Sequence, residues 1–313
     1  MHRVADQIVE ILEKAGVKRI YGIVGDSLNP VTDALRRRKT IEWIHVRHEE
    51  VAAFAASAEA QLSGNLAVCC GSSGPGNLHL INGLFDAHRN HAPVLAIASH
   101  IPQSQVGMEY FQATHPEQLF KECSAYAELV SEASQAPSIL MSAIQHAWAR
   151  RDVGVVVLPG DIADAPAEMK NLVHPPAYTR ENVVPEHESV SLLARMLDDH
   201  RRITFFCGAG CAGAEDRVVR LAHRLKAPIA YTWRGKDYFE HDNPLGIGMT
   251  GLLGWGDAYK AMHESDMLVL WGTDFPYFNF IPTKPEIVQI DRRGEVLGRR
   301  CRLDLGICGD VSV

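Results

Sequence analysis

The sequence has little of three things: long apolar runs, basic residues in excess, and cysteines in pairs. No apolar run approaches the ~18 residues that a membrane-spanning helix needs, and the first residues lack the pattern of a secretory signal. The seven cysteines are odd in number, and Cys207-x3-Cys211 lacks the second ligand pair of a zinc site. These features argue against a membrane protein, a disulfide-rich secreted domain and a zinc domain, and they predict a cytoplasmic protein.

Positive charge is also scarce. The 31 lysines and arginines are outnumbered by 38 acidic residues, which gives a net charge of −7. A chain with this balance offers no broad basic face for a nucleic acid backbone. The short basic run at 36–39 is typical of a solvated helix end, so we expect no nucleic acid partner. The fifteen histidines lack metal-site spacing, and we expect them to be hydrogen-bonded structural residues with no metal site.

Strand-like and helix-like segments alternate in both halves of the chain. The strand-like segments are apolar throughout, as in 93–98, which is typical of parallel strands buried on both faces. The pattern predicts an α/β fold with two doubly wound parallel sheets. A proline-rich stretch without periodicity separates the two series. We therefore predict a first domain over residues 1–165, a linker over 166–188 and a second domain over 189–313.

A pair of acids, Glu49 and Glu50, opens a helix-like segment of small apolar residues. Acids at this position commonly stabilise a helix through its macrodipole, and that explanation needs no function. If one of them points into the apolar interior, its carboxyl group can share a proton with a ring nitrogen. The sequence leaves both explanations open.

The turn Gly74-Pro75-Gly76-Asn77 connects an apolar strand to a helix. Glycines in such a turn let a ligand approach the backbone, although a tight structural crossover has the same composition. The Lys and Ser/Thr of a P-loop are missing, so the turn does not predict a triphosphate site.

Residues 208–213 form Gly-x-Gly-x-x-Gly after a strand-like segment. In this context a dinucleotide pyrophosphate binds at a helix amino end, which makes an NAD-dependent oxidoreductase an alternative function. The acid expected after the next strand is missing, because that strand leads into Trp233-Arg234. Asp291 ends a later strand and could bind a ribose hydroxyl there.

Six segments together resemble the thiamine diphosphate-dependent pyruvate oxidase family, and most of all its flavin-containing, quinone-reducing pyruvate dehydrogenases. They are residues 47–55, 74–84, 110–112, 156–161, 248–251 and 272–277. The resemblance implies a pyrimidine-binding domain followed by a Rossmann-like central domain that binds FAD. It also implies that pyruvate is oxidatively decarboxylated to acetate and CO₂, with the electrons passing through FAD to a quinone.

The resemblance assigns three catalytic residues in the first half. Glu49 matches the glutamate that hydrogen-bonds the aminopyrimidine of thiamine diphosphate and promotes its imino tautomer. Phe111 and Gln112 match residues near the reacting centre, with Phe111 between the thiazolium and the flavin. Four further residues match the turn that lines the pyrimidine pocket: Gly74, Pro75, Gly76 and Asn77.

In the second half, the resemblance assigns a set of residues to the flavin. They are Gly208, Gly210, Arg234, Thr250, Gly251, Leu252, Leu253, Thr273, Asp274, Phe275, Pro276, Tyr277 and Asp291. Because the family's cofactor lies between subunits, the resemblance also implies a homo-oligomer.

The sequence departs from the family in ways that bear on activity. The family's third domain, which holds the diphosphate through Mg²⁺, has no counterpart in this sequence, and residues 309–313 read as a loop before a further helix. We therefore expect the chain alone to be inactive and to need that domain, for example on a separate chain. Ala113 stands where close relatives carry an acid. An acetolactate synthase-like or other 2-oxo acid-decarboxylating enzyme is one alternative, and a non-catalytic cofactor-binding partner subunit is another.

Overall fold

The computed structural model describes residues 2–167, 181–254 and 256–313, and the chain divides into two compact units. The first unit is Met1–Arg180 and the second is Glu181–Val313. Most of the predicted linker, residues 168–180, lies outside the described residues. None of the helices in the described ranges is both long and apolar enough to cross a bilayer.

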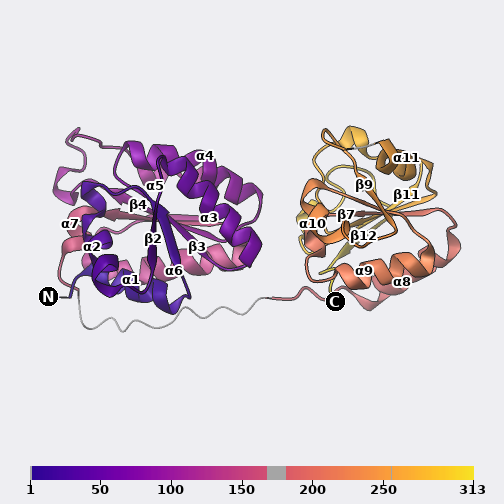
Figure 1. Cartoon of the computed structure of the whole chain (residues 1–313), viewed down its shortest axis with the longest axis horizontal. Helices are drawn as coiled ribbons and strands as arrows, with labels where there is room; N and C mark the ends of the chain where they lie inside the picture. The colour runs from indigo at the N-terminus through magenta and orange to yellow at the C-terminus, as the bar shows by residue number, and fades with distance from the viewer. Residues whose placement is uncertain (1, 168–180, 255) are drawn as a thin grey trace. The chain divides into compact units, whose positions relative to one another are not determined.

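The first unit is built on a parallel six-stranded sheet (Figure 1). Its strand order is β2-β1-β3-β4-β6-β5, so the connections change direction between β1 and β3. The strands are β1 (Arg19–Gly22), β2 (Glu42–His45), β3 (Ala67–Gly71), β4 (Val94–His100), β5 (Tyr126–Leu129) and β6 (Val153–Pro159). The helices are α1 (Val4–Lys14), α2 (Asn29–Arg38), α3 (Glu49–Ser63), α4 (Pro75–Arg89), α5 (Pro116–Leu119), α6 (Ala136–Arg150) and α7 (Gly160–Asp164).

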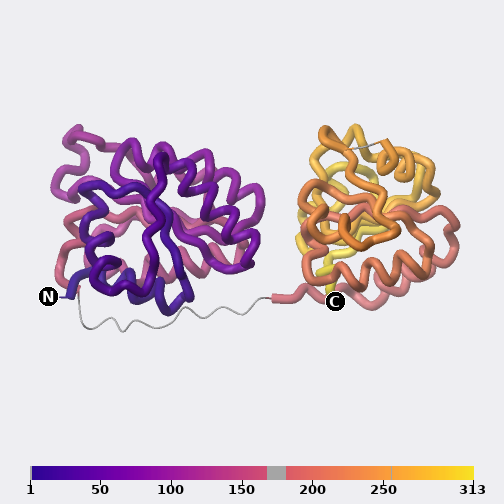
Figure 2. Tube along the Cα trace, viewed as in Figure 1, coloured from indigo at the N-terminus to yellow at the C-terminus, as the bar shows by residue number. Residues whose placement is uncertain are grey.

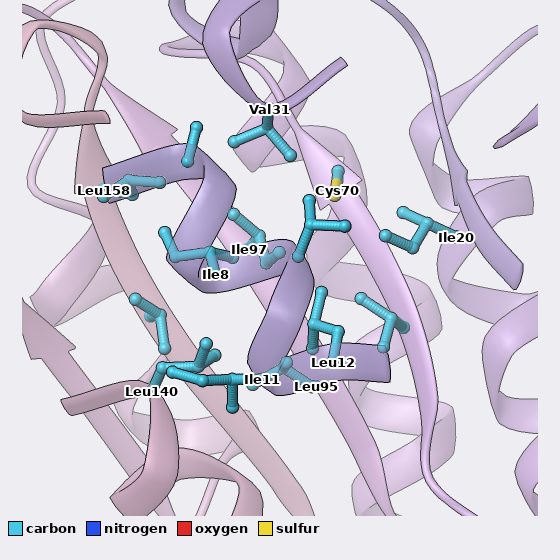
Figure 3. Close-up of a cluster of buried hydrophobic side chains, with 14 of the residues drawn as sticks. Ile8, Ile11, Leu12, Ile20, Val31, Cys70, Leu95, Ile97, Leu140 and Leu158 are labelled. Carbon is cyan, nitrogen blue, oxygen red and sulfur yellow. The ribbon is translucent and has the colours of Figure 1, made fainter. Parts of the chain in front are cut away.

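One face of this sheet is covered by α1, α2 and α6. Helix α1 has apolar residues at helical spacing, and its side chains pack onto the strands beneath it (Figure 3). The buried cluster includes Ile8, Ile11 and Leu12 of α1, Cys70 of β3, Leu95 and Ile97 of β4, Leu140 of α6 and Leu158 of β6. Burial of these side chains holds the strands in register and fixes the sheet edge where the strands end.

The other face is covered by α3 and α4, which approach each other closely. A methyl group at Gly83 of α4 would lie 2.5 Å from Cβ of Ala53 in α3. The small residues of α3, among them Ala52, Ala53, Ala56 and Ala60, are buried against α4 and the sheet. This close packing explains the alanine-rich sequence of α3 and brings the first turns of the two helices together.

The second unit contains another parallel six-stranded sheet, whose chain path can be followed from orange to yellow in Figure 2. Its order, β12-β11-β10-β7-β8-β9, is the 3-2-1-4-5-6 order of doubly wound dinucleotide-binding folds. The strands are β7 (Ile203–Cys207), β8 (Ile229–Tyr231), β9 (Gly246–Met249), β10 (Met267–Trp271), β11 (Glu286–Asp291) and β12 (Leu305–Cys308). The helices are α8 (His187–Asp199), α9 (Glu215–Leu225), α10 (Lys236–Phe239) and α11 (Gly256–Glu264). The predicted fold class, two doubly wound parallel sheets, is confirmed.

Candidate functional site

Glu49 is the first residue of α3, four residues after His45, which ends β2. The ring of His48 caps the helix, because its Nδ1 accepts a hydrogen bond from the Glu50 backbone N–H at 3.3 Å. The Glu49 side chain turns inward and is only 9% exposed. The Glu50 side chain is half-buried and accepts a hydrogen bond from the amide of Asn82. The sequence allowed either a stabilising effect on the helix macrodipole or an inward-pointing carboxyl group. The structure shows that the carboxyl group of Glu49 points inward.

The Glu49 carboxylate lies against the turn that follows β3. A methyl group at Gly76 would lie 3.2 Å from Oε1 of Glu49 and 2.8 Å from Oγ of Ser72. Gly74 has a φ of +69°, a conformation that favours glycine. Only glycine at position 76 leaves the space beside the carboxylate open, so the two segments form one site.

Asn77 lies in the first turn of α4 and is completely buried. Its amide nitrogen donates to the backbone carbonyl of Ser99 at the end of β4, at 2.7 Å. Its Oδ1 is buried and has no hydrogen-bond partner within the described part of the chain. Since buried polar atoms are nearly always paired, this acceptor and the space at Gly76 fit a bound polar ring that carries a donor.

The segment after β4 reaches the same turn through Gln112. Gln112 has a φ of +64°, and a methyl group at Gly74 would lie 2.8 Å from its Cβ. Oγ of Ser73 donates to Oε1 of Gln112 at 3.3 Å. The neighbouring Phe111 is 78% exposed. Of the three residues predicted to be catalytic, the structure thus brings Glu49 and Gln112 to the turn and leaves Phe111 in solvent.

The loop after β1 anchors the turn from the opposite side. Oγ of Ser27 accepts a hydrogen bond from the backbone N–H of Ser73 at 3.0 Å, and Oγ of Ser99 donates to the Ser27 carbonyl at 2.6 Å. Since the strand connections change direction between β1 and β3, this contact lies at the topological switch point, where ligands bind in open α/β sheets.

Two histidines, His79 and His48, belong to this site although neither was predicted to be a site residue. Nδ1 of His79 lies 3.0 Å from Oε2 of Glu49, and its ring stacks on that of His48 with centroids 4.2 Å apart. The available signal was spacing: His79 follows Pro75 by four residues on α4, so it returns to the helix face that carries the turn. It is the polar partner that holds the Glu49 carboxylate in place.

His100, at the end of β4, does not match the expectation that the histidines are hydrogen-bonded. It is 3% exposed, and its Nδ1 has no partner among the residues that the structure describes. Burial lowers the pKa of this imidazole below its ordinary value, so it is neutral at pH 7.

The residues assigned to the flavin follow five strands of the second sheet. Because all the strands are parallel, these residues gather at one edge. Gly208 and Gly210 follow β7, Arg234 follows β8, Thr250, Gly251, Leu252 and Leu253 follow β9, Thr273, Asp274, Phe275, Pro276 and Tyr277 follow β10, and Asp291 ends β11.

The loops after β7 and β10 cross at the switch point of this sheet. A methyl group at Gly208 would lie 2.5 Å from the Gly272 carbonyl oxygen and 2.6 Å from Cβ of Thr273. The Gly210 backbone N–H donates to the same carbonyl at 2.9 Å. The first two glycines of the Gly-x-Gly-x-x-Gly segment are therefore required for contact between the two loops, whereas a methyl group at Gly213 would meet nothing within 4 Å.

A cluster of aromatic side chains lies where the loops after β9 and β10 meet. The rings of Phe275 and Tyr277 are 5.3 Å apart, and a methyl group at Gly251 would lie 3.0 Å from Cζ of Phe275. Leu252 and Leu253 are each 70% exposed. This part of the edge presents aromatic and aliphatic surface that suits a planar ring system.

The two acids assigned to the flavin have different surroundings. Asp291 is buried, and burial raises the pKa of its carboxyl above the ordinary value, against the opposing effect of a hydrogen bond from the Arg293 backbone. Asp274 is paired with Arg299 at 3.1 Å and with Arg300 at 3.2 Å. Asp274 therefore anchors the β10 loop to the segment after β11.

The structure disfavours the NAD alternative in the geometry expected for it, with the pyrophosphate at the helix amino end. The Gly-x-Gly-x-x-Gly segment leads first into a 3-10 turn, Ala209–Cys211, and the helix that follows begins only at Glu215. Glu215 and Asp216 occupy the first turn of that helix. Two carboxylates there oppose the binding of a pyrophosphate at the helix amino end.

Comparison with known proteins identifies both units. Residues 2–120 match the N-terminal TPP binding domain of the thiamine pyrophosphate enzymes, and residues 190–313 match their central domain. The chain belongs to the thiamine pyrophosphate enzyme family. The predicted resemblance to thiamine diphosphate-dependent enzymes is thus confirmed, and the first unit holds the part of the chain that matches the TPP-binding domain.

Three relatives illustrate the range of similarity. An uncharacterized 42.6 kDa protein of Pseudomonas amyloderamosa is 57% identical over 99% of this chain and 78% of its own length. The putative thiamine pyrophosphate-containing protein YdaP of Bacillus subtilis is 35% identical over 100% of this chain and 55% of its own. Pyruvate oxidase of Lactiplantibacillus plantarum is 32% identical over 97% of this chain and 52% of its own. The chain thus spans about half the length of the latter two.

Proposed function

We propose that this chain is the pyrimidine-binding and flavin-binding part of an enzyme that oxidatively decarboxylates pyruvate to acetate and CO₂ and passes the electrons through FAD to a quinone. The observation that carries the proposal is the buried Glu49 carboxylate, held by His79 at 3.0 Å and facing the glycine turn at Gly76. The similarity to a pyruvate oxidase supports the choice of substrate.

The residues at the first site fit an aminopyrimidine ring. When bound, thiamine diphosphate supplies an electron sink for the decarboxylation of a 2-oxo acid. Glu49 would hold a proton at a ring nitrogen, since a buried carboxyl is well placed for proton sharing. Oδ1 of Asn77 would accept a hydrogen bond, while Gly74, Pro75 and Gly76 would let the ring approach the backbone and exclude water.

The rest of the pocket positions these groups. His79 fixes the carboxylate of Glu49, and Gln112 closes the turn through its hydrogen bond with Ser73. Phe111 projects from the same segment and is free to contact a bound cofactor ring. We infer that it serves the reacting centre, together with Gln112.

The second unit would hold FAD at the carboxyl edge of its sheet. The crossing loops at Gly208 and Gly210 would line the dinucleotide, while the exposed Leu252 and Leu253 and the aromatic cluster around Phe275 are suited to its ring system. FAD would accept the two electrons released by oxidation of the substrate and deliver them to the quinone.

The complete activity needs a site for the diphosphate and its Mg²⁺. In the described ranges, no group of acidic, histidine or cysteine side chains is arranged to hold a metal ion. We propose that a diphosphate-binding domain, for example on a separate chain, supplies this site, and that the working enzyme is an oligomer. The chain alone should then turn over pyruvate at a background rate.

The test is an assay of pyruvate consumption with thiamine diphosphate, Mg²⁺, FAD and a soluble quinone. We expect turnover when a diphosphate-binding domain is added, and a loss of about 10²-fold or more in Glu49→Gln. Asn82→Ala, which removes a partner of Glu50 outside the pocket, is the matched control and should keep its activity.

Other outcomes would contradict parts of the proposal. Robust turnover by the chain alone would show that no further domain is needed. Formation of acetolactate without reduction of the quinone would favour an acetolactate synthase-like enzyme. Unchanged turnover in Glu49→Gln would point to a non-catalytic partner subunit, and reduction of oxygen in place of the quinone would change the electron acceptor.

A further inference from the structure

A groove of about 570 Å³ runs beside α2 in the first unit. This volume is within the range of roughly 300–1,000 Å³ that is typical of small-molecule sites. The groove lies between the last turn of α2 and the edge strand β2, and none of the predicted cofactor residues lines it. It is therefore a separate candidate for binding.

The rim of the groove carries unpaired positive charge. Lys18, Arg36 and Lys39 line it, against the single acid Glu42. Arg36 shares its charge with Asp33 at 2.8 Å, and Glu42 is 3.8 Å from Arg19. Lys18 and Lys39 have no side-chain hydrogen bond or ion pair with any described residue. Two ammonium groups are thus available to a ligand.

The wall of the groove is apolar and aromatic. It includes Leu35, Ile41 and the indole ring of Trp43. The far end of that ring lies over β1, because a methyl group at Gly22 would be 2.9 Å from Cη2 of Trp43. The indole N–H is buried and has no acceptor within the described ranges. The ring is held by packing against Gly22 and the core of the first unit, and it forms a fixed aromatic part of the wall.

We propose that this groove binds a small phosphate monoester that carries a planar ring, of the size of a nucleoside monophosphate. A phosphate monoester carries about −1.5 to −2 charges at pH 7, which matches the two unpaired ammonium groups of Lys18 and Lys39. A singly charged carboxylate would leave one of them unpaired. A nucleic acid strand is disfavoured by the net charge of −7, whereas a small anion feels mainly the local charge.

The experiment is a calorimetric titration of the full chain with adenosine monophosphate, in the presence of excess FAD. The FAD occupies any adenine site in the second unit. We expect saturable binding with a Kd of about 1 mM or tighter. In Lys18→Gln/Lys39→Gln the affinity should fall at least about 10-fold, because both charged partners of the phosphate are removed. Adenosine and inorganic phosphate should each bind more weakly than the monophosphate.

A matched control changes two lysines of the second unit. Lys260→Gln/Lys284→Gln removes the same total charge and should leave the affinity for adenosine monophosphate unchanged. The proposal is overturned if wild type shows no binding at about 1 mM, if both double variants bind equally well, or if inorganic phosphate binds as tightly as the monophosphate. No residue of the thiamine diphosphate site is altered, so either result is independent of the proposed catalytic function.

Discussion

Replacing Gly76 by alanine tests whether the turn and the Glu49 carboxylate form one closely fitted site. The added methyl group would lie 2.8 Å from Oγ of Ser72, 3.2 Å from Oε1 of Glu49 and 3.3 Å from the carbonyl carbon of Gly71. The first distance is shorter than real methyl contacts allow, so at least Ser72 or the turn must move. Since Gly76 does not have a positive φ, the substitution acts through crowding and not through backbone strain.

The magnitude follows from two opposing effects. Overpacking of this kind costs about 1–3 kcal/mol, whereas an alanine in a helix gains about 0.4–1 kcal/mol by restricting the unfolded chain. We expect a net loss of roughly 0.5–2 kcal/mol in the free energy of unfolding. For a unit of this size, that loss lowers Tm by roughly 1–8 °C.

The assay is thermal unfolding of the full chain, combined with a titration with thiamine diphosphate in the presence of the diphosphate-binding domain. Displacement of the Glu49 carboxylate should weaken cofactor binding by about 10-fold or more. Gly256→Ala is the control: Gly256 is also in a first helical turn, but its added methyl group meets nothing within 4 Å. The reasoning is refuted if Gly76→Ala is as stable as wild type and binds the cofactor equally well.

Two further predictions concern the stability of the first unit. Gly83→Ala should destabilise it by more than Gly76→Ala in urea unfolding, because its methyl group would lie 2.5 Å from Cβ of Ala53 and 2.7 Å from the backbone nitrogen of Phe54; equal stability to wild type would contradict the close packing of α3 and α4. Hydrogen bonds from Arg36, Arg3 and Arg37 hold the pKa of Asp33 well below its ordinary value of 3.8. The stability that these bonds contribute is fully present above pH 3.8 and is lost as the pH falls from there towards the lower pKa of Asp33 in the folded protein. Tm should therefore fall more steeply with acid in wild type than in Asp33→Asn. Parallel curves of Tm against pH would refute this.

The central strands and the edge strand β2 could be predicted from the sequence, whereas the other edge strands could not. Strands such as β4 and β10 are buried on both faces and therefore appear as continuous apolar runs. The strands β5, β9 and β12 lie at sheet edges, are only partly buried and have mixed sequences. Their sequences carry little signal, because pairing to a neighbour on one side determines their conformation.

The site shows a similar division. The inward orientation of Glu49 was one of two explanations that its position allowed, and burial against Gly76 decided between them. His79 was not predicted, because its contact with Glu49 joins two helices 30 residues apart. The roles of the flavin-assigned residues stay predictions, although their placement at one sheet edge follows from parallel topology.

The central claim is that Glu49 shares a proton with the aminopyrimidine of thiamine diphosphate. The most direct measurement is the rate of deuterium exchange at C2 of the bound cofactor, followed by NMR with the diphosphate-binding domain present. Our account predicts that Glu49→Gln, with its fold verified by circular dichroism, slows this exchange by about 10²–10⁴-fold. Exchange that is equally fast in wild type and Glu49→Gln would contradict it.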